Sequence, residues 1–434
     1  FLAQRPRSLS HESSRMASTP RSTPPTAARL AALSARYGSV ADAEATRASL
    51  LAVLSSGRAV SKSPSPVPTH ACPEAEACDT EGLVLEFVSI EVERGERCPL
   101  LLCRAAPTSA PSQGAAAVTG DTAAPGAADA PLRPVFVLHG TGKSLTDLLR
   151  NGHLQRFARA GLLAVGVDAR HHGARAQAAG GSTYSADNSS YWAALIAAWR
   201  ADDAQPVGPN PNPNPNTAKH RHPFIWDTVW DLMRVLDWLE CRPDVDCSRV
   251  GATGISLGGM MSWYWAAADP RVSAIAPAIG VQSFRYALEH DAWHARAGSL
   301  APLMGAAAAD MGRALDAEVM LAVWARIAPG IDGALDAAAT LACAAWPATD
   351  SAPPRPVLVV NSAADPRCPR AGVETAVLAA RAVLGPHRDA LRLYMDETIA
   401  AAPLPAEQWA TGHVVTPAMW AQIDRFMQEA VLRA

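Results

Sequence analysis

Residues 250–259 read VGATGISLGG, and this stretch decides the expected fold. It contains a Gly-x-Ser-x-Gly pentapeptide whose central residue is Ser256. A strand pattern runs into the pentapeptide from Val250 to Thr253, and helix-forming residues follow it. Strand, sharp turn and helix are the context of a nucleophile elbow, in which the serine has a strained backbone and small neighbours let the chain approach. The alternative is a glycine-rich turn with an idle serine; we predict that Ser256 is a catalytic nucleophile.

A serine hydroxyl is a poor nucleophile by itself and needs a base that is oriented by an acid. Asp365 and His413 are the candidates, because each lies on an expected loop after a predicted strand. Asp350 precedes its strand, and His387 lies in an exposed-looking Pro-His-Arg turn, so neither competes well. The alternative interpretations are a turn-capping aspartate and a solvent-facing histidine. We predict a catalytic triad of Ser256, Asp365 and His413.

A second turn, HGTGKS at residues 139–144, follows a predicted strand. The backbone N–H groups of Thr141 and Leu257 are the expected oxyanion hole, which stabilises the charge that develops during acyl transfer. The letters GTGKS also resemble the end of a phosphate-binding loop. The first glycine of that motif would be residue 137, which is Val137, so the sequence excludes a nucleotide site of this type.

Short apolar runs alternate with helical segments along much of the chain. Six strands are expected at residues 135–138, 162–167, 250–253, 272–278, 357–360 and 391–394. The first four are nearly continuous apolar runs, which is typical of strands covered on both faces. Two further strand patterns flank a turn at residues 94–95. The alternation predicts an α/β fold with a mostly parallel central sheet and helices on both faces.

Residues 283–350 interrupt this alternation, because they are helix-prone and contain no clear strand pattern. Since they lie between two predicted strands, we expect a helical cap above the carboxyl edge of the sheet. The cap contains Trp293 and Trp324, which we predict to line an apolar substrate pocket. The alternative is that both tryptophans are ordinary core residues of the cap.

The other segments suggest a simple domain organisation. Residues 1–80 are expected to form an accessory, partly disordered region, and residues 81–434 one catalytic domain. Within it, residues 107–131 and 204–219 are low-complexity loops, because their Ala/Gly/Pro/Thr-rich and Pro-Asn sequences cannot bury a core. The N-terminal stretch lacks the apolar centre of a secretory signal and is mildly similar to a transit peptide. We therefore expect an intracellular protein, in the cytoplasm or in a plastid or other organelle.

Charge and composition exclude several classes of partner. The formal net charge is −3, which gives no electrostatic reason to expect nucleic acid or an anionic membrane surface. No apolar run is long enough for a membrane span. We interpret His171 and His172 as part of a structural loop near the active-site rim, because adjacent side chains diverge. Asp227 and Asp231 are interpreted as a polar helix face. We expect no metal and no cofactor.

The stretch 226–282, which includes WDLMRVLDWLECRPDVDCSRVGATGISLGG, resembles α/β-hydrolases of the dienelactone hydrolase, acetyl esterase and prolyl-oligopeptidase branch. Three loops fit the same family: DARHHGAR, NSAADPRCP and GHVVTPAMW. The resemblance covers roughly residues 83–434 apart from the low-complexity loops. It implies the α/β-hydrolase fold, the triad and the oxyanion hole assigned above. Dienelactone hydrolases carry a cysteine nucleophile, so Ser256 argues against that particular activity.

We therefore expect a serine carboxylesterase-like hydrolase that cleaves small-molecule esters through an acyl-enzyme intermediate. A peptidase or thioesterase of the same fold is the nearest alternative. A ligand receptor built on the hydrolase fold is a second alternative, and the presence of His413 disfavours it. The sequence contains no signal for the oligomeric state.

Overall fold

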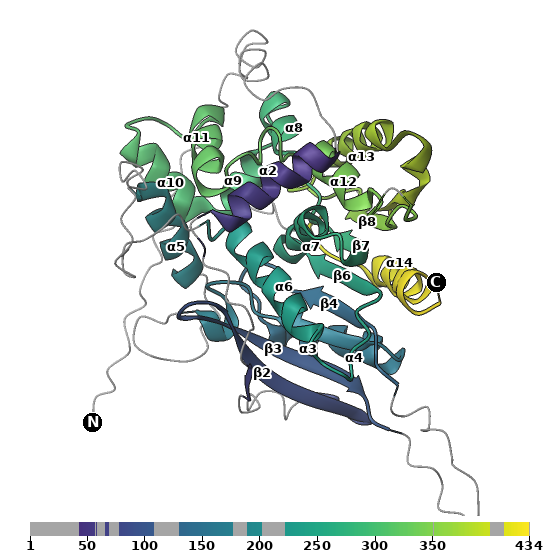
Figure 1. Cartoon of the computed structure of the whole chain (residues 1–434). Helices are drawn as coiled ribbons and strands as arrows, with labels where there is room; N and C mark the ends of the chain where they lie inside the picture. The colour runs from purple at the N-terminus through teal and green to yellow at the C-terminus, as the bar shows by residue number, and fades with distance from the viewer. Residues whose placement is uncertain are drawn as a thin grey trace, which may run out of the picture.

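The computed structural model describes residues 43–56, 58, 66–68, 78–107, 130–176, 189–201, 222–349, 351–399 and 412–433. The predicted low-complexity loops lie outside these residues, apart from positions 107, 130 and 131, and so do residues 1–42. The described elements surround one central sheet (Figure 1). None of the described helices is both long and apolar enough to cross a membrane.

Nine strands of the described chain form a single sheet in the order β1-β2-β3-β5-β4-β6-β7-β8-β9. From β5 to β9 neighbouring strands are parallel, whereas β1, β2 and β3 form an antiparallel edge. The strands are β1 Pro66–Pro68, β2 Leu83–Glu93, β3 Glu96–Ala105, β4 Pro134–Leu138, β5 Leu163–Val167, β6 Val250–Ile255, β7 Val272–Ala278, β8 Val357–Ser362 and β9 Leu391–Asp396. The six predicted strands are confirmed within two residues at each end, and the predicted mostly parallel sheet is confirmed with them.

Helices cover both faces of this sheet. On one face, α2, α6, α7, α12 and α13 contribute to one hydrophobic core, and on the other α3, α4 and α14 contribute to a second. The helices are α2 Ala43–Ser55, α3 Leu145–Arg150, α4 His153–Arg159, α5 Ser189–Arg200, α6 Trp226–Leu239, α7 Leu257–Ala268, α8 Phe284–Glu289, α9 His294–Ser299, α10 Ala301–Asp310, α11 Ala317–Ile327, α12 Ala337–Ala345, α13 Arg370–Leu384 and α14 Pro417–Met427. Because both faces are covered, every residue of β4 and β5 is buried.

The local sequence explains how these helices begin and which face they bury. Val229, Leu232 and Leu236 recur at helical spacing along α6, and all three are completely buried. Thr416 caps α14 by accepting a hydrogen bond from the Met419 N–H, as its position before a proline predicts. Helix burial and strand burial therefore follow the periodicities of the sequence.

The interval between β7 and β8 contains the five helices α8 to α12. They share the core that α6 and α7 build on the sheet, and α10 and α11 also pack against α5. Figure 1 shows α8, α9, α10 and α11 grouped at one end of the molecule. The insertion is therefore an extension of the main core.

The described part of residues 1–80 packs on the same domain. Helix α2 contacts α6, α7 and α12, and β1 pairs with β2 at the sheet edge. Arg47 donates to the Ala267 carbonyl at 3.2 Å, and the Cys343 thiol donates to the Ala43 carbonyl at 3.2 Å. Helix α2 therefore contributes to the core of the sheet domain, in which Leu50 and Leu54 are buried; the division at residue 80 stays a prediction.

Arg355 joins the ends of two core helices. Its guanidinium donates five hydrogen bonds to backbone carbonyls, those of Ala266, Asp269, Val272, Cys343 and Trp346, at 2.7 to 3.3 Å. These carbonyls lie at and just beyond the carboxyl ends of α7 and α12, where the last turn of a helix lacks intrahelical donors. Burial lowers the pKa of Arg355 to about 10, so the side chain remains charged at neutral pH.

Replacing Arg355 with Met is expected to lower the free energy of unfolding by about 3 kcal/mol or more, because several buried carbonyls lose their donor. Urea unfolding followed by circular dichroism measures the change. The matched control is Arg94→Met in the exposed turn between β2 and β3, for which we expect a change below about 0.5 kcal/mol. Equal midpoints for the two variants would contradict this role of Arg355.

Candidate active site

The turn between β6 and α7 holds Ser256 in a backbone conformation that few residues adopt. Its φ is 56° and its ψ is −111°, a sparsely populated region for a residue with a side chain. A Cβ on Gly254 would lie 2.4 Å from the carbonyl carbon of Gly258, and a Cβ on Gly258 would lie 2.2 Å from the Leu138 carbonyl oxygen. Only glycine fits at these two positions, and the strand–turn–helix geometry expected of a nucleophile elbow is present.

The three predicted triad residues come from three separate segments and meet beside this turn. The Ser256 Oγ lies 2.7 Å from the His413 Nε2, and the His413 Nδ1 lies 2.8 Å from Asp365 Oδ2. Asp365 follows β8, and His413 precedes α14. A Cβ on Gly412 would lie 2.0 Å from the Ala364 carbonyl oxygen, so this glycine lets the histidine segment approach the acid loop.

The Asp365 carboxylate is held in place by its own loop. Its Oδ1 accepts hydrogen bonds from the backbone N–H groups of Arg367 at 2.8 Å and Cys368 at 3.0 Å. The side chain is buried, with 2% exposure, so these bonds and the imidazole replace its hydration. A carboxylate in this position fixes the imidazole so that Nδ1 donates and Nε2 accepts.

The surroundings of His413 favour the neutral imidazole. Burial lowers its pKa below the ordinary value of 6.5; Asp365 opposes this shift, and the positive charges of Arg367 and Arg296 add to it. At neutral pH the ring is therefore able to accept a proton from Ser256. This is the protonation state that general-base chemistry requires.

The predicted oxyanion donors lie on the two glycine-containing turns next to Ser256. Thr141 lines the same cavity as Ser256 and His413. Leu257 is the first residue of α7, so its N–H has no acceptor within the helix. His139 secures the Thr141 turn: its Nδ1 lies 2.9 Å from the Gly140 carbonyl, and its Nε2 accepts from the Ala169 N–H at 3.0 Å. Burial lowers the pKa of His139 and keeps one nitrogen as donor and the other as acceptor.

The loop after β5 forms hydrogen bonds with the turn that contains His139 and with the start of α3. The Asp168 carboxylate accepts from the Leu145 N–H at 2.7 Å and the Ala174 N–H at 2.9 Å. Gly173 has a φ of 51°, and a Cβ there would lie 2.3 Å from the carboxylate. The loop thus holds the start of α3 through Asp168 and the His139 turn through Ala169.

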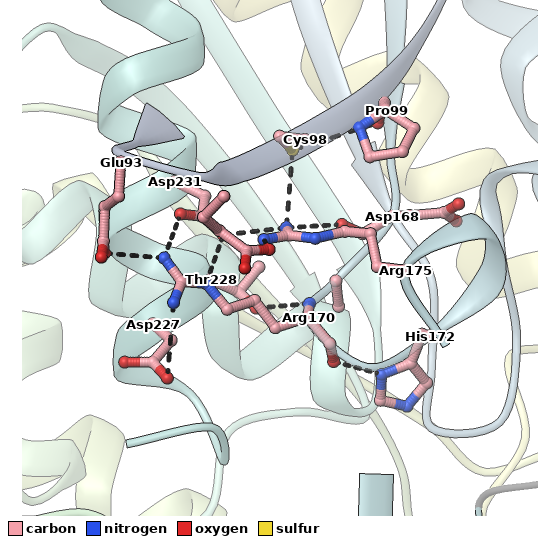
Figure 2. Close-up of polar contacts among 12 residues, drawn as sticks. Glu93, Cys98, Pro99, Asp168, Arg170, His172, Arg175, Asp227, Thr228 and Asp231 are labelled. Atoms are coloured by element: carbon pink, nitrogen blue, oxygen red, sulfur yellow. Dashed lines mark hydrogen bonds and ion pairs between the residues drawn. The ribbon is translucent and has the colours of Figure 1, made fainter. Parts of the chain in front are cut away.

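Buried ion pairs anchor this loop to α6 (Figure 2). Arg170 donates to both oxygens of Asp231, at 2.7 and 2.9 Å, and Arg175 pairs with one of the same oxygens at 2.8 Å. Arg58 pairs with Asp227, which is also buried. Burial alone would raise the pKa of both carboxyls, but the arginines hold it below the usual value. The predicted polar helix face is therefore wrong, because both aspartates point into the interior.

The two adjacent histidines of the loop have structural surroundings. His172 is buried, its Nδ1 lies 2.9 Å from the Arg170 carbonyl, and its ring packs at 4.5 Å from that of Tyr191. Within the described part of the chain, the side chains grouped as metal-ligand types are Asp365, Cys368 and His413, and neither histidine of the loop belongs to that group. These contacts support the interpretation of the loop as a structural element.

A cavity of about 240 Å³ opens beside Ser256. Its walls come from residues 139–153, with Ile255, Ile279, Arg367 and His413. A larger hollow of about 460 Å³ lies between α2 and α11, and no triad residue lines it. The smaller cavity is the one that a substrate of Ser256 would enter.

The prediction that Trp293 and Trp324 line this cavity is wrong. Neither they nor any other residue of the 283–350 insertion lines it, and both side chains are buried in the hydrophobic core, at 2% and 0% exposure. Trp324 packs edge-on against Phe284 at 4.8 Å. The insertion buries its bulky residues against its own helices and the sheet, so it does not roof the cavity.

The sequence did not predict several polar residues of the cavity, among them Lys143, His153 and Arg367. Lys143 and His153 lie on the turn and helix after β4, and Arg367 lies two residues after Asp365. Each lies close in sequence to a predicted site residue. Their proximity in sequence to the 139–144 turn or to Asp365 could have identified them as residues of the cavity.

Comparisons with known proteins agree with this geometry. Residues 220–361 match the family model described as X-Pro dipeptidyl-peptidase (S15 family). YtaP of Bacillus subtilis strain 168, whose name describes a hydrolase, is 41% identical over 44 residues, which are 10% of this chain and 15% of that protein. The chain thus spans only a small part of the curated relative that it matches.

Solved structures match over nearly the whole chain. Acetyl xylan esterase 1 from Thermoanaerobacterium sp. JW/SL YS485 superposes with a TM-score of 0.54 at 17% identity, covering 94% of this chain and 99% of that chain. The acetyl xylan esterase from Paenibacillus sp. R4 gives 0.52 at 16% identity, covering 93% and 99%. At such identity the likeness establishes the fold. The elbow, the sheet order and these superpositions together show that the chain has the α/β-hydrolase fold.

Proposed function

We propose that this protein hydrolyses carboxylic esters of small molecules through an acyl-enzyme intermediate. The observation that carries the proposal is the continuous hydrogen-bonded chain from Ser256 through His413 to Asp365, at 2.7 and 2.8 Å, beside an open cavity. A hydroxyl, a base and an orienting acid in this order are the requirements of nucleophilic acyl transfer.

The steps of the reaction follow from these positions. The Ser256 Oγ attacks the ester carbonyl carbon while His413 Nε2 takes the hydroxyl proton. The N–H groups of Thr141 and Leu257 stabilise the negative oxygen of the tetrahedral intermediate. The imidazolium then gives its proton to the departing alcohol, and the acyl group remains on Ser256. Water, deprotonated by His413, attacks the acyl-enzyme and releases the acid.

Two considerations favour an ester over a peptide as substrate. The small cavity has room for a compact acyl group, and the solved structures with the same fold include proteins named as acetyl xylan esterases. A peptidase is the second candidate, because residues 220–361 match a family model described as a dipeptidyl-peptidase.

Ser256→Ala or His413→Ala is expected to lower ester hydrolysis by about 10⁴- to 10⁶-fold, since triad members act as one unit. Asp365→Asn should lower the rate of ester hydrolysis by a factor on the order of 10⁴, because it misorients the base without removing it. Initial rates with 4-nitrophenyl acetate measure the loss. The matched control is Ser262→Ala, a buried serine one turn along α7 that donates to the Gly259 carbonyl. A fluorophosphonate probe should label the wild type and the Ser262 variant alone, and labelling of Ser256→Ala protein would refute the nucleophile.

Esters and peptides can be compared directly. We expect kcat/KM for 4-nitrophenyl acetate to exceed that for Ala-Pro-4-nitroanilide, both measured by release of the coloured product. Ser256→Ala must abolish both activities if both belong to this site. Faster cleavage of the proline anilide would replace the esterase proposal with the peptidase, and a labelled enzyme that cleaves neither would favour another acyl substrate.

The pH dependence follows from the lowered pKa of His413. The base must be neutral, so kcat/KM for a neutral ester should be constant above about pH 6.5 and should fall as acid protonates the ring. Arg367→Gln removes a positive charge that lowers this pKa, so its acid limb should move to higher pH. Rate profiles from pH 4 to 9 test both. An acid limb that moves to lower pH in the variant would contradict the electrostatic role of Arg367.

A further inference from the structure

The cavity beside Ser256 carries an excess of positive charge. Lys143 and Arg367 both line it, and Asp147 is the carboxylate among its lining residues. The Asp147 carboxylate is already occupied, because it accepts from the Ser144 N–H at 2.9 Å and from Arg150 at 2.9 Å. Neither lining cation forms a salt bridge within the described residues.

The histidines of the cavity do not change this balance. Burial lowers the pKa of His153 to about 4, helped by Arg156, and burial likewise lowers the pKa of His139 and His413. All three rings are therefore neutral at pH 7. The charge that faces a bound molecule comes from Lys143 and Arg367.

Arg367 lies beside a second arginine, Arg296, and neither forms an ion pair with a carboxylate of the described residues. The Nε atoms of Arg367 and Arg296 are buried and make no hydrogen bond in the described structure. Arg296 is 4% exposed, and its Nη2 lies 3.8 Å from the Cys368 thiol. The acid of the same loop, Asp365, already accepts from His413 and from two backbone amides. Burial lowers the pKa of Arg367, and the positive charge of Arg296 lowers it further, which shows that the two guanidinium groups repel each other; Asp365 opposes the shift.

Several other buried arginines of the described chain have partners: Arg355 binds five backbone carbonyls, and three more pair with carboxylates. Arg58, Arg170 and Arg175 each pair with at least one carboxylate, as described above. A guanidinium that loses hydration without gaining an anion is costly, so buried charges are normally paired. Arg367 breaks this pattern at a cavity wall, and this position allows a ligand to supply the missing anion.

We propose that the cavity binds esters that carry a free carboxylate close to the scissile carbonyl, with that carboxylate on the Arg367 guanidinium and Lys143 at the entrance. The inference rests on the proposed esterase function and names its substrate class. A planar guanidinium presents paired N–H donors that match a carboxylate, and such charge-assisted bonds are stronger than neutral ones. A charged cavity replaces the apolar substrate pocket expected from the sequence, because no residue of the 283–350 insertion lines it.

The test compares two methyl esters with acyl chains of five carbons, monomethyl glutarate and methyl pentanoate. The first ends in a carboxylate where the second ends in a methyl group, and methanol release measured by NMR reports both. For the wild type we expect kcat/KM to be about tenfold or more higher for the anionic ester, the size of one charge-assisted hydrogen bond. In Arg367→Gln this ratio should fall to about one. Salt at high concentration should also reduce the ratio in the wild type.

Arg370→Gln is the matched control. Arg370 follows on the same loop and begins α13, but its side chain pairs with Glu374 and Glu397 at the surface. Its ester ratio should equal that of the wild type. Equal rates for the two esters in the wild type, or an unchanged ratio in Arg367→Gln, would overturn the proposal.

A binding experiment separates this inference from the esterase function. Calorimetric titration of Ser256→Ala protein with glutarate requires no turnover. Binding that is lost in the Ser256→Ala/Arg367→Gln double variant supports the carboxylate site even if neither ester is cleaved. No heat of binding to the Ser256→Ala protein, together with equal ester rates in the wild type, would reject it.

Discussion

The structure depends on the close approach of backbone segments at the start of α7. A Cβ on Gly258 would lie 2.2 Å from the Leu138 carbonyl oxygen, and a Cβ on Gly259 would lie 2.8 Å from the Ala278 carbonyl oxygen. These contacts bring the carboxyl ends of β4, β6 and β7 together without intervening side chains. The turns that carry Thr141, Ser256 and Ile279 therefore surround one cavity. In an α/β fold, functional groups gather at this edge of the sheet because each strand ends there in a loop.

A second layer of buried polar contacts holds those turns in place. Arg170, Arg175 and Asp231 anchor the loop after β5, and that loop binds the His139 turn through the Ala169 N–H. Buried ion pairs add little net stability compared with apolar side chains of similar volume. These ion pairs fix the position of the loop, because Arg170 binds both oxygens of the Asp231 carboxylate and Arg175 binds one of them. Through these contacts, Asp231 on α6 helps to position the turn that carries the proposed oxyanion donor Thr141.

Large aromatic side chains lie in the core, whereas charged side chains line the cavity, and the free energy of apolar burial explains the difference. Aromatic side chains bury 150–250 Å² each, which contributes several kcal/mol at about 25 cal/mol per Å². Trp293 and Trp324 gain this free energy by packing in the core of the insertion, so they are not left to line a substrate cavity. The cavity walls are instead formed by the turn and short helices after β4, where charged residues such as Lys143 lie at the surface. A small, positively charged cavity next to a large apolar core is the result.

Local sequence was sufficient for the strands, for the elbow around Ser256, and for the selection of Asp365 and His413, because these features depend on periodicity, turn chemistry and order along the chain. Local sequence did not predict the burial of Asp227 and Asp231, whose spacing is also that of a solvated helix face. Their partners are distant in sequence: Arg170 and Arg175 lie on the loop after β5, and Arg58 follows α2. The packing of α2 against α7 and α12, and the direction in which the insertion buries its tryptophans, were likewise decided by contacts between distant segments. Periodicity reports which face of one element is apolar, whereas only the folded chain determines which charges meet and which side chains border a cavity.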